Sequence, residues 1–324
     1  MDAVLTILRA AGELTRLRIL ALLRRGALAV NEIVDVLGQS QPRVSRHLKL
    51  LCDAGLLDRF REGTLIFYRL SDTGLGQQLR DSILSFMDEA DPQILADRDA
   101  LKAIRHARVA RSQAYFRANA EKWDEIRSLY VPEAEVEAAL LDLAGSRAIG
   151  HLLDVGTGTG RMLQLFADRS HTGLGIDLSR EMLAVARGEL SRLSLDHCQV
   201  RQADMYGLPV DDGSQDLVVF HQVLHFAEHP EDALREAARV LAPAGRLLIA
   251  DFAPHDEEML REQHAHRRLG FDTDEVIRWA AEAGLKSRAV RHLDGGRLRV
   301  TLWRFDKAGM PDMRGADSKV GEAA

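Results

Sequence analysis

Cysteine is nearly absent from this chain of 324 residues, in which only Cys52 and Cys198 occur. Two distant cysteines cannot build a disulfide framework or a cysteine zinc cluster, and such sparse use is typical of proteins in a reducing cytosol. The sequence has no run of about 18 or more apolar residues, so we expect no segment that spans a membrane. The first residues include Asp2 and alternate polar with apolar side chains, unlike a secretory signal peptide. These absences predict a cytoplasmic location.

Net charge is also small, at −6, but its distribution is uneven. Residues 1–70 contain 11 Lys and Arg against 7 Asp and Glu, a balance of +4, whereas the remaining residues contain 32 against 42 and carry −10. A basic head on an acidic body indicates contact of the head with nucleic acid. Chance variation of surface charge would give the same imbalance, so charge alone leaves both explanations open.

Length and composition predict a protein of about two domains with ordinary packed cores, because 46% of the residues are hydrophobic. We predict a small domain over residues 1–90 and a helical connector over residues 91–147. Alternating strands and helices follow over residues 148–305, which makes the fold class α/β. Residues 306–324 are rich in Gly, Ala and charge, and we expect them to form a disordered tail.

The small domain carries helical patterns followed by a hairpin signal. Val44, Leu48 and Leu51 recur at i, i+4 and i+7, in a helix that we expect to begin after Ser40, a good N-cap residue. Two apolar runs follow, and residues 61–64 (Arg-Glu-Gly-Thr) lie between them as a turn. Two helices joined by a short glycine-containing turn and then a hairpin predict a winged helix-turn-helix.

In that fold the helix after Ser40 is the recognition helix, whose N-terminal residues point into the major groove of DNA. Several polar side chains fall off its apolar stripe and are of types that contact base edges or phosphates. The predicted DNA-binding residues are Ser40, Gln41, Arg43, Ser45, Arg46 and His47, together with Arg61 at the hairpin tip. Winged helices also serve as protein-interaction modules, but the polar density and positive charge favour double-stranded DNA as the partner.

Three strings in this domain, Thr15–Leu20, Gln41–Leu56 and Tyr68–Leu70, resemble winged-helix repressors of the ArsR type. The resemblance implies a homodimer, built on the first helix and on the helix after the hairpin, that binds a palindromic operator. Many such repressors sense metals through a cysteine motif on the third helix or through Asp and His ligands on the last one. Residues 28–33 contain no Cys and residues 72–90 contain no His. We therefore expect no metal and a different effector.

A glycine-rich loop is the strongest chemical signal in the chain. The apolar run His151–Val155 leads into Gly156, Gly158 and Gly160, and a helical pattern follows. Glycine allows a tight turn and the close approach of a ligand to the main chain. Asp177 ends the next apolar run, 21 residues after Gly156, where an acidic side chain can accept both hydroxyls of a ribose.

Two cofactors fit such a loop, a dinucleotide or S-adenosylmethionine (SAM). A dinucleotide fingerprint spaces its glycines as G-x-G-x-x-G, whereas this loop has the spacing G-x-G-x-G with Asp154 two residues ahead of it. A third apolar run ends at Asp204 and Met205, where an acid can bond the adenine amino group and an apolar side chain can pack on the ring. Carboxylates at three successive strand ends suit the ammonium group of SAM better than a pyrophosphate.

Residues 148–305 resemble class I SAM-dependent methyltransferases of the small-molecule branch, which implies a doubly wound, Rossmann-like sheet. The resemblance implies that the loop glycines contact the amino-acid end of SAM or S-adenosylhomocysteine (SAH), that Asp177 binds the ribose and that Asp204 binds the adenine. Tyr115–Asp124 resembles a helix that closes over the cofactor, with plain core packing as the alternative. The predicted cofactor-binding residues are Asp154, Gly156, Gly158, Gly160, Asp177, Asp204, Met205, Phe220 and Tyr115.

Methyl transfer requires alignment of donor and acceptor, and it needs a general base only if the acceptor must lose a proton. His221 and His225 follow the fourth apolar run, where ligands lie in doubly wound sheets, so either could be that base. The alternative is that both only shape the pocket. His264 and His266 are spaced i, i+2, on different helix faces, and make a weak metal site. Arsenic methylation would need several cysteine thiolates, which the chain lacks.

Three functions therefore compete. In the first, the protein is a transcriptional regulator that uses SAM or SAH as its effector, with little turnover. In the second, it is a methyltransferase of a small molecule that also binds DNA. In the third, it is such a methyltransferase and the winged helix serves only dimerisation. The polar recognition helix favours a DNA-binding regulator over a pure enzyme.

Overall fold

The computed structural model describes residues 1–24, 26–62, 64–71, 73–119, 132–295 and 298–309. The chain divides into two compact units, Met1–Ser112 with Asp256–Met259, and Gln113–His255 with Leu260–Ala324. The division falls inside two helices, α6 (Pro92–Asn119) and α12 (Glu258–Gln263). The boundaries expected at residues 90, 147 and 305 stay predictions, and residues 310–324 of the expected tail lie outside the described residues. Within the described ranges, none of the helices combines the length and the apolar character needed to cross a membrane.

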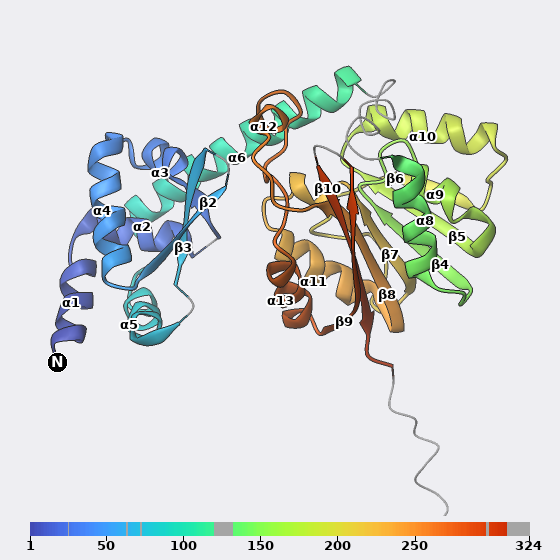
Figure 1. The fold of residues 1–324 in the computed structure, drawn as a ribbon. Coiled ribbons are helices and arrows are strands. Elements are labelled where there is room, and N and C mark those ends of the chain that lie inside the picture. Colours follow the sequence, from blue (N-terminus) through green and yellow to red (C-terminus); the bar gives the residue numbers. More distant parts are fainter. Residues whose placement is uncertain (25, 63, 72, 120–131, 296–297, 310–324) are drawn as a thin grey trace, which may run out of the picture. The chain divides into compact units, whose positions relative to one another are not determined.

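The first unit is the winged helix-turn-helix expected from the sequence (Figure 1). Its three-stranded antiparallel sheet has the order β1-β3-β2, and β2 and β3 form the wing. The elements are α1 (Asp2–Ala11), α2 (Leu14–Leu23), β1 (Leu28–Ala29), α3 (Val30–Leu37), α4 (Gln41–Asp53), β2 (Leu57–Glu62), β3 (Leu65–Leu70), α5 (Gly74–Ser85) and the beginning of α6.

Local sequence explains how α4 is positioned. Gly38 ends α3 in the left-handed conformation, with φ at 62°, which costs little for a residue without Cβ. Ser40 precedes α4 as predicted, although its side chain makes no capping hydrogen bond. Val44, Leu48 and Leu51 are fully buried in the core of this unit, which confirms the apolar stripe. The opposite face of α4 is therefore turned away from the core.

The second unit contains one seven-stranded sheet with the order β6-β5-β4-β7-β8-β10-β9. Neighbouring strands from β6 to β8 pair in parallel, and β10 runs antiparallel to both β8 and β9. The strands are β4 (Ile149–Val155), β5 (Ser170–Asp177), β6 (Cys198–Gln202), β7 (Gln215–His221), β8 (Leu241–Phe252), β9 (Leu285–Asp294) and β10 (Arg299–Lys307). The helices are α8 (Glu133–Ala144), α9 (Arg161–Leu165), η2 (Ala167–Arg169), α10 (Arg180–Arg192), η3 (Leu224–Phe226), α11 (Pro230–Val240) and α13 (Thr273–Glu282).

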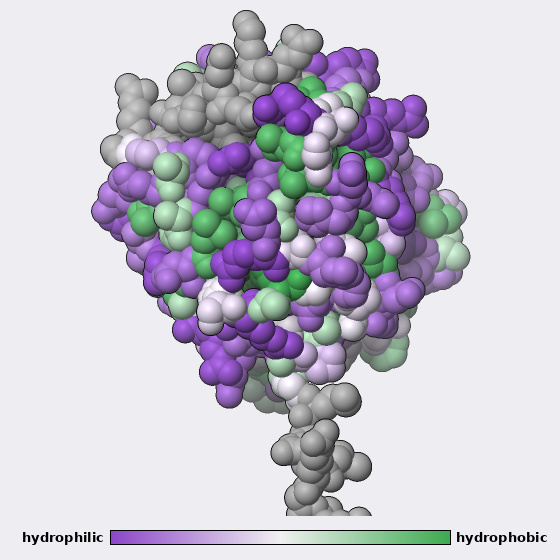
Figure 2. All heavy atoms as spheres, turned by 90° about the vertical axis from the view of Figure 1, so that its right-hand side faces the viewer, coloured by the Kyte–Doolittle hydropathy of each residue, from purple (hydrophilic) through white to green (hydrophobic). Residues whose placement is uncertain are grey.

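Helices cover both faces of this sheet. Successive residues of a strand point to opposite faces, and in β4 the side chain of Leu152 joins one core cluster while that of Leu153 joins another. The first cluster contains side chains of α8 and α9, and the second contains side chains of α11 and α13. On the side of the molecular surface shown in Figure 2, hydrophilic side chains predominate and hydrophobic ones are scattered among them. The doubly wound α/β arrangement predicted from the sequence is confirmed.

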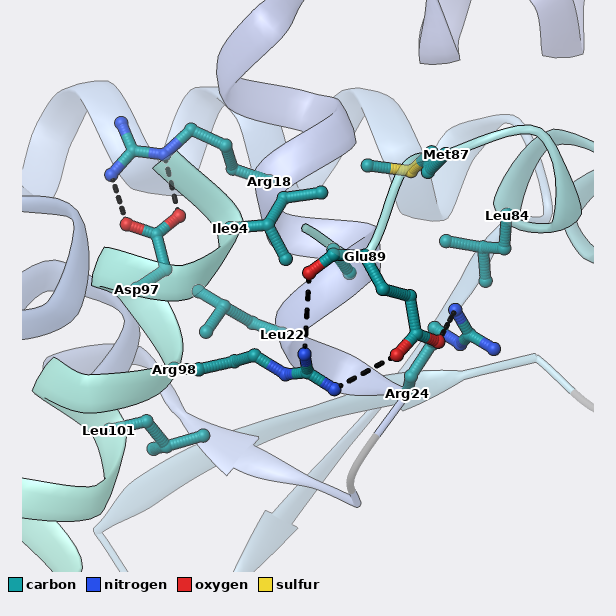
Figure 3. A pocket seen from close by; sticks show the side chains of 11 residues that line it. Arg18, Leu22, Arg24, Leu84, Met87, Glu89, Ile94, Asp97, Arg98 and Leu101 are labelled. Carbon is teal, nitrogen blue, oxygen red and sulfur yellow. Dashed lines mark hydrogen bonds and ion pairs between the residues drawn. The ribbon is translucent and has the colours of Figure 1, made fainter. Parts of the chain in front are cut away.

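A cavity of about 240 Å³ lies inside the first unit, between α2, the end of α5 and the beginning of α6 (Figure 3). Its wall is mostly apolar and includes Ala21, Leu22, Leu84, Met87, Ile94 and Leu101. Two groups of ion pairs border it. The buried Asp97 carboxylate accepts hydrogen bonds from Arg18 Nε at 2.7 Å and Nη2 at 2.6 Å. The exposed Glu89 pairs with Arg24 and Arg98, each at 3.1 Å.

These two groups of ion pairs should differ in their effect on stability. We expect Asp97→Ala to lower the free energy of unfolding by about 1.5–3 kcal/mol, because the half-buried Arg18 guanidinium loses its charged hydrogen-bond acceptor. Glu89→Ala, at an exposed pair on the same cavity, should lower it by less than about 1 kcal/mol. Urea unfolding of the full chain, followed by circular dichroism, measures both. Equal losses in the two variants would contradict the larger contribution that we assign to the ion pair of Asp97.

Candidate functional site

Polar side chains gather on the exposed face of α4. Ser40, Gln41, Arg43 and Arg46 are exposed, and Ser45 is half-buried. No acidic residue occupies the first turn of α4. The structure therefore brings five of the predicted DNA-binding residues together on one helix end that carries positive charge.

His47 lies differently from these residues. Its ring is half-buried, and Nδ1 is 3.5 Å from Oε2 of Glu13, the residue that caps α2. Burial lowers the pKa of His47, Glu13 opposes that shift, and nearby arginines add to it. Arg61, in contrast, is exposed on strand β2 of the wing. His47 thus faces α2, whereas Arg61 is accessible beside the hairpin turn.

The glycine loop begins at the carboxyl end of β4. All its glycines have positive φ angles, 70° at Gly156, 52° at Gly158 and 84° at Gly160. A Cβ on Gly156 would lie 2.2 Å from Cγ2 of Val223, so this close approach requires glycine. The buried Asp154 carboxylate accepts a hydrogen bond from Thr157 Oγ1 at 2.6 Å. This bond ties the loop to the strand that precedes it.

Asp177 ends β5 and holds the loop from the neighbouring strand. Its carboxylate accepts hydrogen bonds from the backbone N–H of Gly158 at 3.0 Å and of Ser179 at 2.8 Å. Burial raises the pKa of the Asp177 carboxyl, and these hydrogen bonds oppose the shift because they favour the charged form. Val155 pairs with Ile176 in parallel register, so the loop and Asp177 lie side by side at the carboxyl edge of the sheet.

Asp204, Met205 and Phe220 differ in their exposure. Asp204 follows β6 and is exposed, and its carboxylate accepts a hydrogen bond from the backbone N–H of Tyr206 at 3.1 Å. Met205 is half-buried against a core cluster that also contains the fully buried Phe220. Because β6 pairs in parallel with β5, Asp204 lies at the same edge as Asp177. Phe220 lies within the core, below that edge.

His221 ends β7 and is buried. Its Nε2 lies 3.2 Å from Oε1 of Glu133, in α8, so this imidazole faces a carboxylate from another element. The next residue, Gln222, has φ at 49°, a strained conformation for a residue with a side chain. Strain of this kind concentrates at functional sites.

His225, in η3, is held by Asp251 near the end of β8. The His225 Nδ1 lies 2.7 Å from Asp251 Oδ1, and the His225 backbone N–H donates to Asp251 Oδ2 at 3.2 Å. The two side chains are 2% and 0% exposed. The His266 ring stacks on that of His225 with centroids 3.9 Å apart and an angle of 22° between the planes. Burial, and then its charged neighbours, lower the pKa of His266 well below its ordinary value.

Residues 113–119 of α6 belong to the second unit. The Tyr115 hydroxyl lies 2.7 Å from His264 Nδ1, and the Phe116 ring packs edge-on against that of Phe226 at 4.9 Å. These contacts place the end of α6 beside η3, which carries His225. The remainder of the predicted cofactor helix, including Trp123 and Asp124, lies outside the described residues.

The sequence analysis missed Asp251, and it considered His266 only as part of a weak metal site. Asp251 carries the same signal as Asp177, an acid at the end of an apolar run. The position of His266 depends on a chain reversal, because the backbone N–H groups of residues 267–268 donate to the His225 carbonyl. No local pattern shows this contact. Among the residues that the structure describes, no group of three or more His, Cys, Asp and Glu is arranged to hold a metal ion.

Two family models match this chain. Residues 14–59 match the bacterial regulatory proteins of the arsR family, and residues 153–249 match a methyltransferase domain. The chain joins an ArsR-family regulatory domain to a methyltransferase domain. The first match contains α4, and the second contains the glycine loop, Asp177 and His225. The two resemblances stated from the sequence are thereby confirmed.

Several curated relatives of the methyltransferase domain are named methyltransferases. The uncharacterized methyltransferase YcgJ of Bacillus subtilis (strain 168) is 30% identical over 142 residues, which are 44% of this chain and 55% of that protein. Demethylmenaquinone methyltransferase of Thermus thermophilus is 37% identical over 117 residues, 35% of this chain and 52% of that protein. This chain thus spans about half the length of the curated relatives it matches. The crystal structure of YcgJ has 20% identity and a TM-score of 0.47, over 54% of this chain and 99% of that chain.

Proposed function

We propose that this protein is an ArsR-type transcriptional regulator that binds double-stranded DNA through α4 and the wing, with SAM or SAH as the effector bound in its methyltransferase domain. The observation that carries the proposal is the glycine loop, held between Asp154 and Asp177 at the carboxyl edge of a parallel sheet. Ligands of doubly wound sheets bind at this edge. We also propose that the protein is a homodimer, in which each α4 contacts one half of a palindromic operator.

The side chains at this edge suit the parts of SAM. Backbone N–H groups of a glycine loop can bind the carboxylate of the methionine end, and Asp154 provides negative charge near its ammonium group. The Asp177 carboxylate has lone pairs for two ribose hydroxyls in addition to its backbone donors. Asp204 can accept from the adenine amino group, and Met205 provides an apolar contact. Tyr115, from α6, would contribute to closing the site. Bound SAM supplies a methyl group on a positively charged sulfur.

Asp177→Asn tests the cofactor site directly. We expect it to weaken the binding of SAM and of SAH at least about tenfold, because hydrogen bonds to a charged group contribute about 1.5–3 kcal/mol. Isothermal titration calorimetry on the full chain measures both affinities. Asp196→Asn, at an exposed carboxylate between α10 and β6, is the matched control and should bind like the wild type. Equal affinity in the wild type and in Asp177→Asn would refute the assignment.

The effector role requires a second experiment, since a ligand shifts an equilibrium only if it binds the two states differently. Binding to DNA from the protein's own promoter is measured at fixed salt, because phosphate contacts make affinity salt-dependent. SAM and SAH are titrated separately. A change in operator affinity of about tenfold or more corresponds to a coupling of about 1.4 kcal/mol and supports the sensor. An affinity that neither ligand changes rejects it.

A second function, catalytic turnover, is favoured by a separate observation. The buried pair of Asp251 and His225 lies at the end of the strand pair β7 and β8, near the edge that carries Asp177. A regulator that only sensed SAM would need no imidazole oriented by a carboxylate. We therefore include methylation of a small molecule in the proposal, with His225 as the base and His221 as the alternative.

A further inference from the structure

His225 and Asp251 come from neighbouring parallel strands. His221, the last residue of β7, pairs with Ala250 of β8, so η3 after β7 and Asp251 near the end of β8 lie at the same edge of the sheet. Substrates of doubly wound sheets lie beyond this edge. The pair therefore occupies the part of the methyltransferase domain where an acceptor would meet the methyl group.

The contacts of Asp251 determine which nitrogen of His225 carries a proton. Asp251 Oδ1 accepts the backbone N–H of Phe252 at 2.8 Å and lies 2.7 Å from His225 Nδ1, while Oδ2 accepts the backbone N–H of His225. A carboxylate can only accept hydrogen bonds, so Nδ1 is the protonated nitrogen. The lone pair of the neutral ring is then on Nε2.

That Nε2 is buried and has no hydrogen-bond partner within the described part of the chain. Buried polar atoms of native proteins are nearly always hydrogen-bonded, so an acceptor in this state is open to a donor from water or from a ligand. The Nε2 of His221, in contrast, lies 3.2 Å from the Glu133 carboxylate, so that nitrogen already faces a charged group of this chain. Of the two histidines considered from the sequence, His225 is therefore the better candidate to accept a proton from a substrate.

The surroundings of His225 indicate what kind of molecule supplies the donor. The His266 ring stacks on His225, and its Nδ1 is also buried without a partner among the described residues. The rings of Phe226 and Phe252 lie 5.2 Å and 5.8 Å from that of His266. Rings of this kind pack well against a flat, unsaturated molecule. Asp251 and His266 are the titratable groups that face His225, and His266 is neutral near pH 7 because its pKa is low.

We propose that His225, oriented by Asp251, is the general base of this domain and that the methyl acceptor is a small aromatic or enolic compound with an acidic hydroxyl. This inference rests on the proposed SAM site. The hydroxyl proton passes to Nε2 of His225, and the oxygen electron pair forms a bond to the methyl carbon. The bond from carbon to sulfur breaks, its electron pair stays on sulfur, and SAH leaves. A phenol, with a pKa of about 10, matches an imidazole base far better than an aliphatic alcohol does.

Histidine tautomers provide a test that needs no turnover. In ¹⁵N NMR spectra of the full chain, with His225 assigned through the variant His225→Gln, we expect Nδ1 protonated and Nε2 unprotonated at neutral pH. Asp251→Asn should remove this preference, because an amide can donate as well as accept. A wild-type His225 protonated on Nε2 overturns the proposal.

Turnover is measured as SAH release from SAM in the presence of catechol, 2-naphthol and hydroquinone, with their O-methyl ethers as blocked controls. We expect methylation of at least one of these phenols. His225→Gln should lower kcat about 100-fold or more, in the range for loss of a general base, while SAM affinity stays within about twofold. The control His292→Gln, on β9, should leave kcat and SAM affinity unchanged.

The outcomes separate this inference from the proposed function. SAM binding without methylation of any of these phenols overturns the inference and leaves the SAM site intact. A His225→Gln variant that loses SAM affinity as much as kcat shows that His225 holds the cofactor, which also overturns it. A wild-type chain that binds neither SAM nor SAH refutes the proposed function itself, and the inference with it.

Discussion

Operator binding is expected to weaken at least about 100-fold when Arg43 and Arg46 are both replaced by alanine. Both side chains are exposed at the N-terminal half of α4, so their removal leaves the core of the first unit intact. A bidentate contact of arginine with a guanine contributes about 1–3 kcal/mol of discrimination, and two such losses account for the expected factor. Fluorescence anisotropy with DNA from the protein's own promoter, at fixed salt, measures the effect.

A matched control for this experiment is the double variant Arg24→Ala and Lys102→Ala. It removes the same charge from exposed positions of the first unit, but not from α4. We expect little change in its operator affinity, and we expect both double variants to sediment like the wild type, as the proposed dimer. A wild-type chain that dimerises but binds no specific DNA would favour the third function, in which the winged helix only joins two methyltransferases.

Gly156→Ala should lower the affinity for SAM at least about 100-fold. The substitution forces a side chain into a left-handed backbone, at a cost of about 1–2 kcal/mol. It also drives Cβ to 2.2 Å from Val223, a stiff β-branched residue, and overpacking of this kind costs about 1–3 kcal/mol. The loop must move to relieve both, and the backbone N–H groups move with it. Isothermal titration calorimetry and thermal unfolding measure binding and stability.

Gly188→Ala is the control for the loop variant. Gly188 lies within α10, and a Cβ there would meet no atom within 4 Å. Alanine at an open helical position stabilises by about 0.5–1 kcal/mol relative to glycine, so this variant should bind SAM normally and unfold at a slightly higher temperature. Normal binding by Gly156→Ala as well would exclude the loop as the cofactor site.

Features that depend on a short stretch of chain could be predicted from the sequence. The helix α4 follows Ser40 as expected, because its apolar stripe and its N-cap residue lie in one short segment. The carboxylates Asp177 and Asp204 were found in the same way, as acids that end apolar runs. Parallel pairing places the carboxyl ends of neighbouring strands at one edge of the sheet. The edge that carries these acids could therefore be predicted without knowing the order of the strands.

Features made by distant segments could not be predicted. His47 looked like its neighbours on α4, but its ring is half-buried and lies 3.5 Å from Glu13, the N-cap residue of α2. The stacking of His266 on His225 depends on how the chain returns after α12, and no spacing in the sequence encodes it. The same holds for the choice between His221 and His225, which differ only in the partners that the fold gives them.

The position of β10 in the sheet has a consequence for biosynthesis. This last described strand lies between β8 and β9, and its residues Leu302, Trp303 and Phe305 are fully buried in the two cores of the second unit. A ribosome delivers the chain from the amino end, so these cores stay open until β10, residues 299–307, has emerged. The helices and wing within residues 1–112 emerge long before that point. A nascent chain that ends before β10 would thus carry a complete winged helix-turn-helix and an incomplete methyltransferase domain.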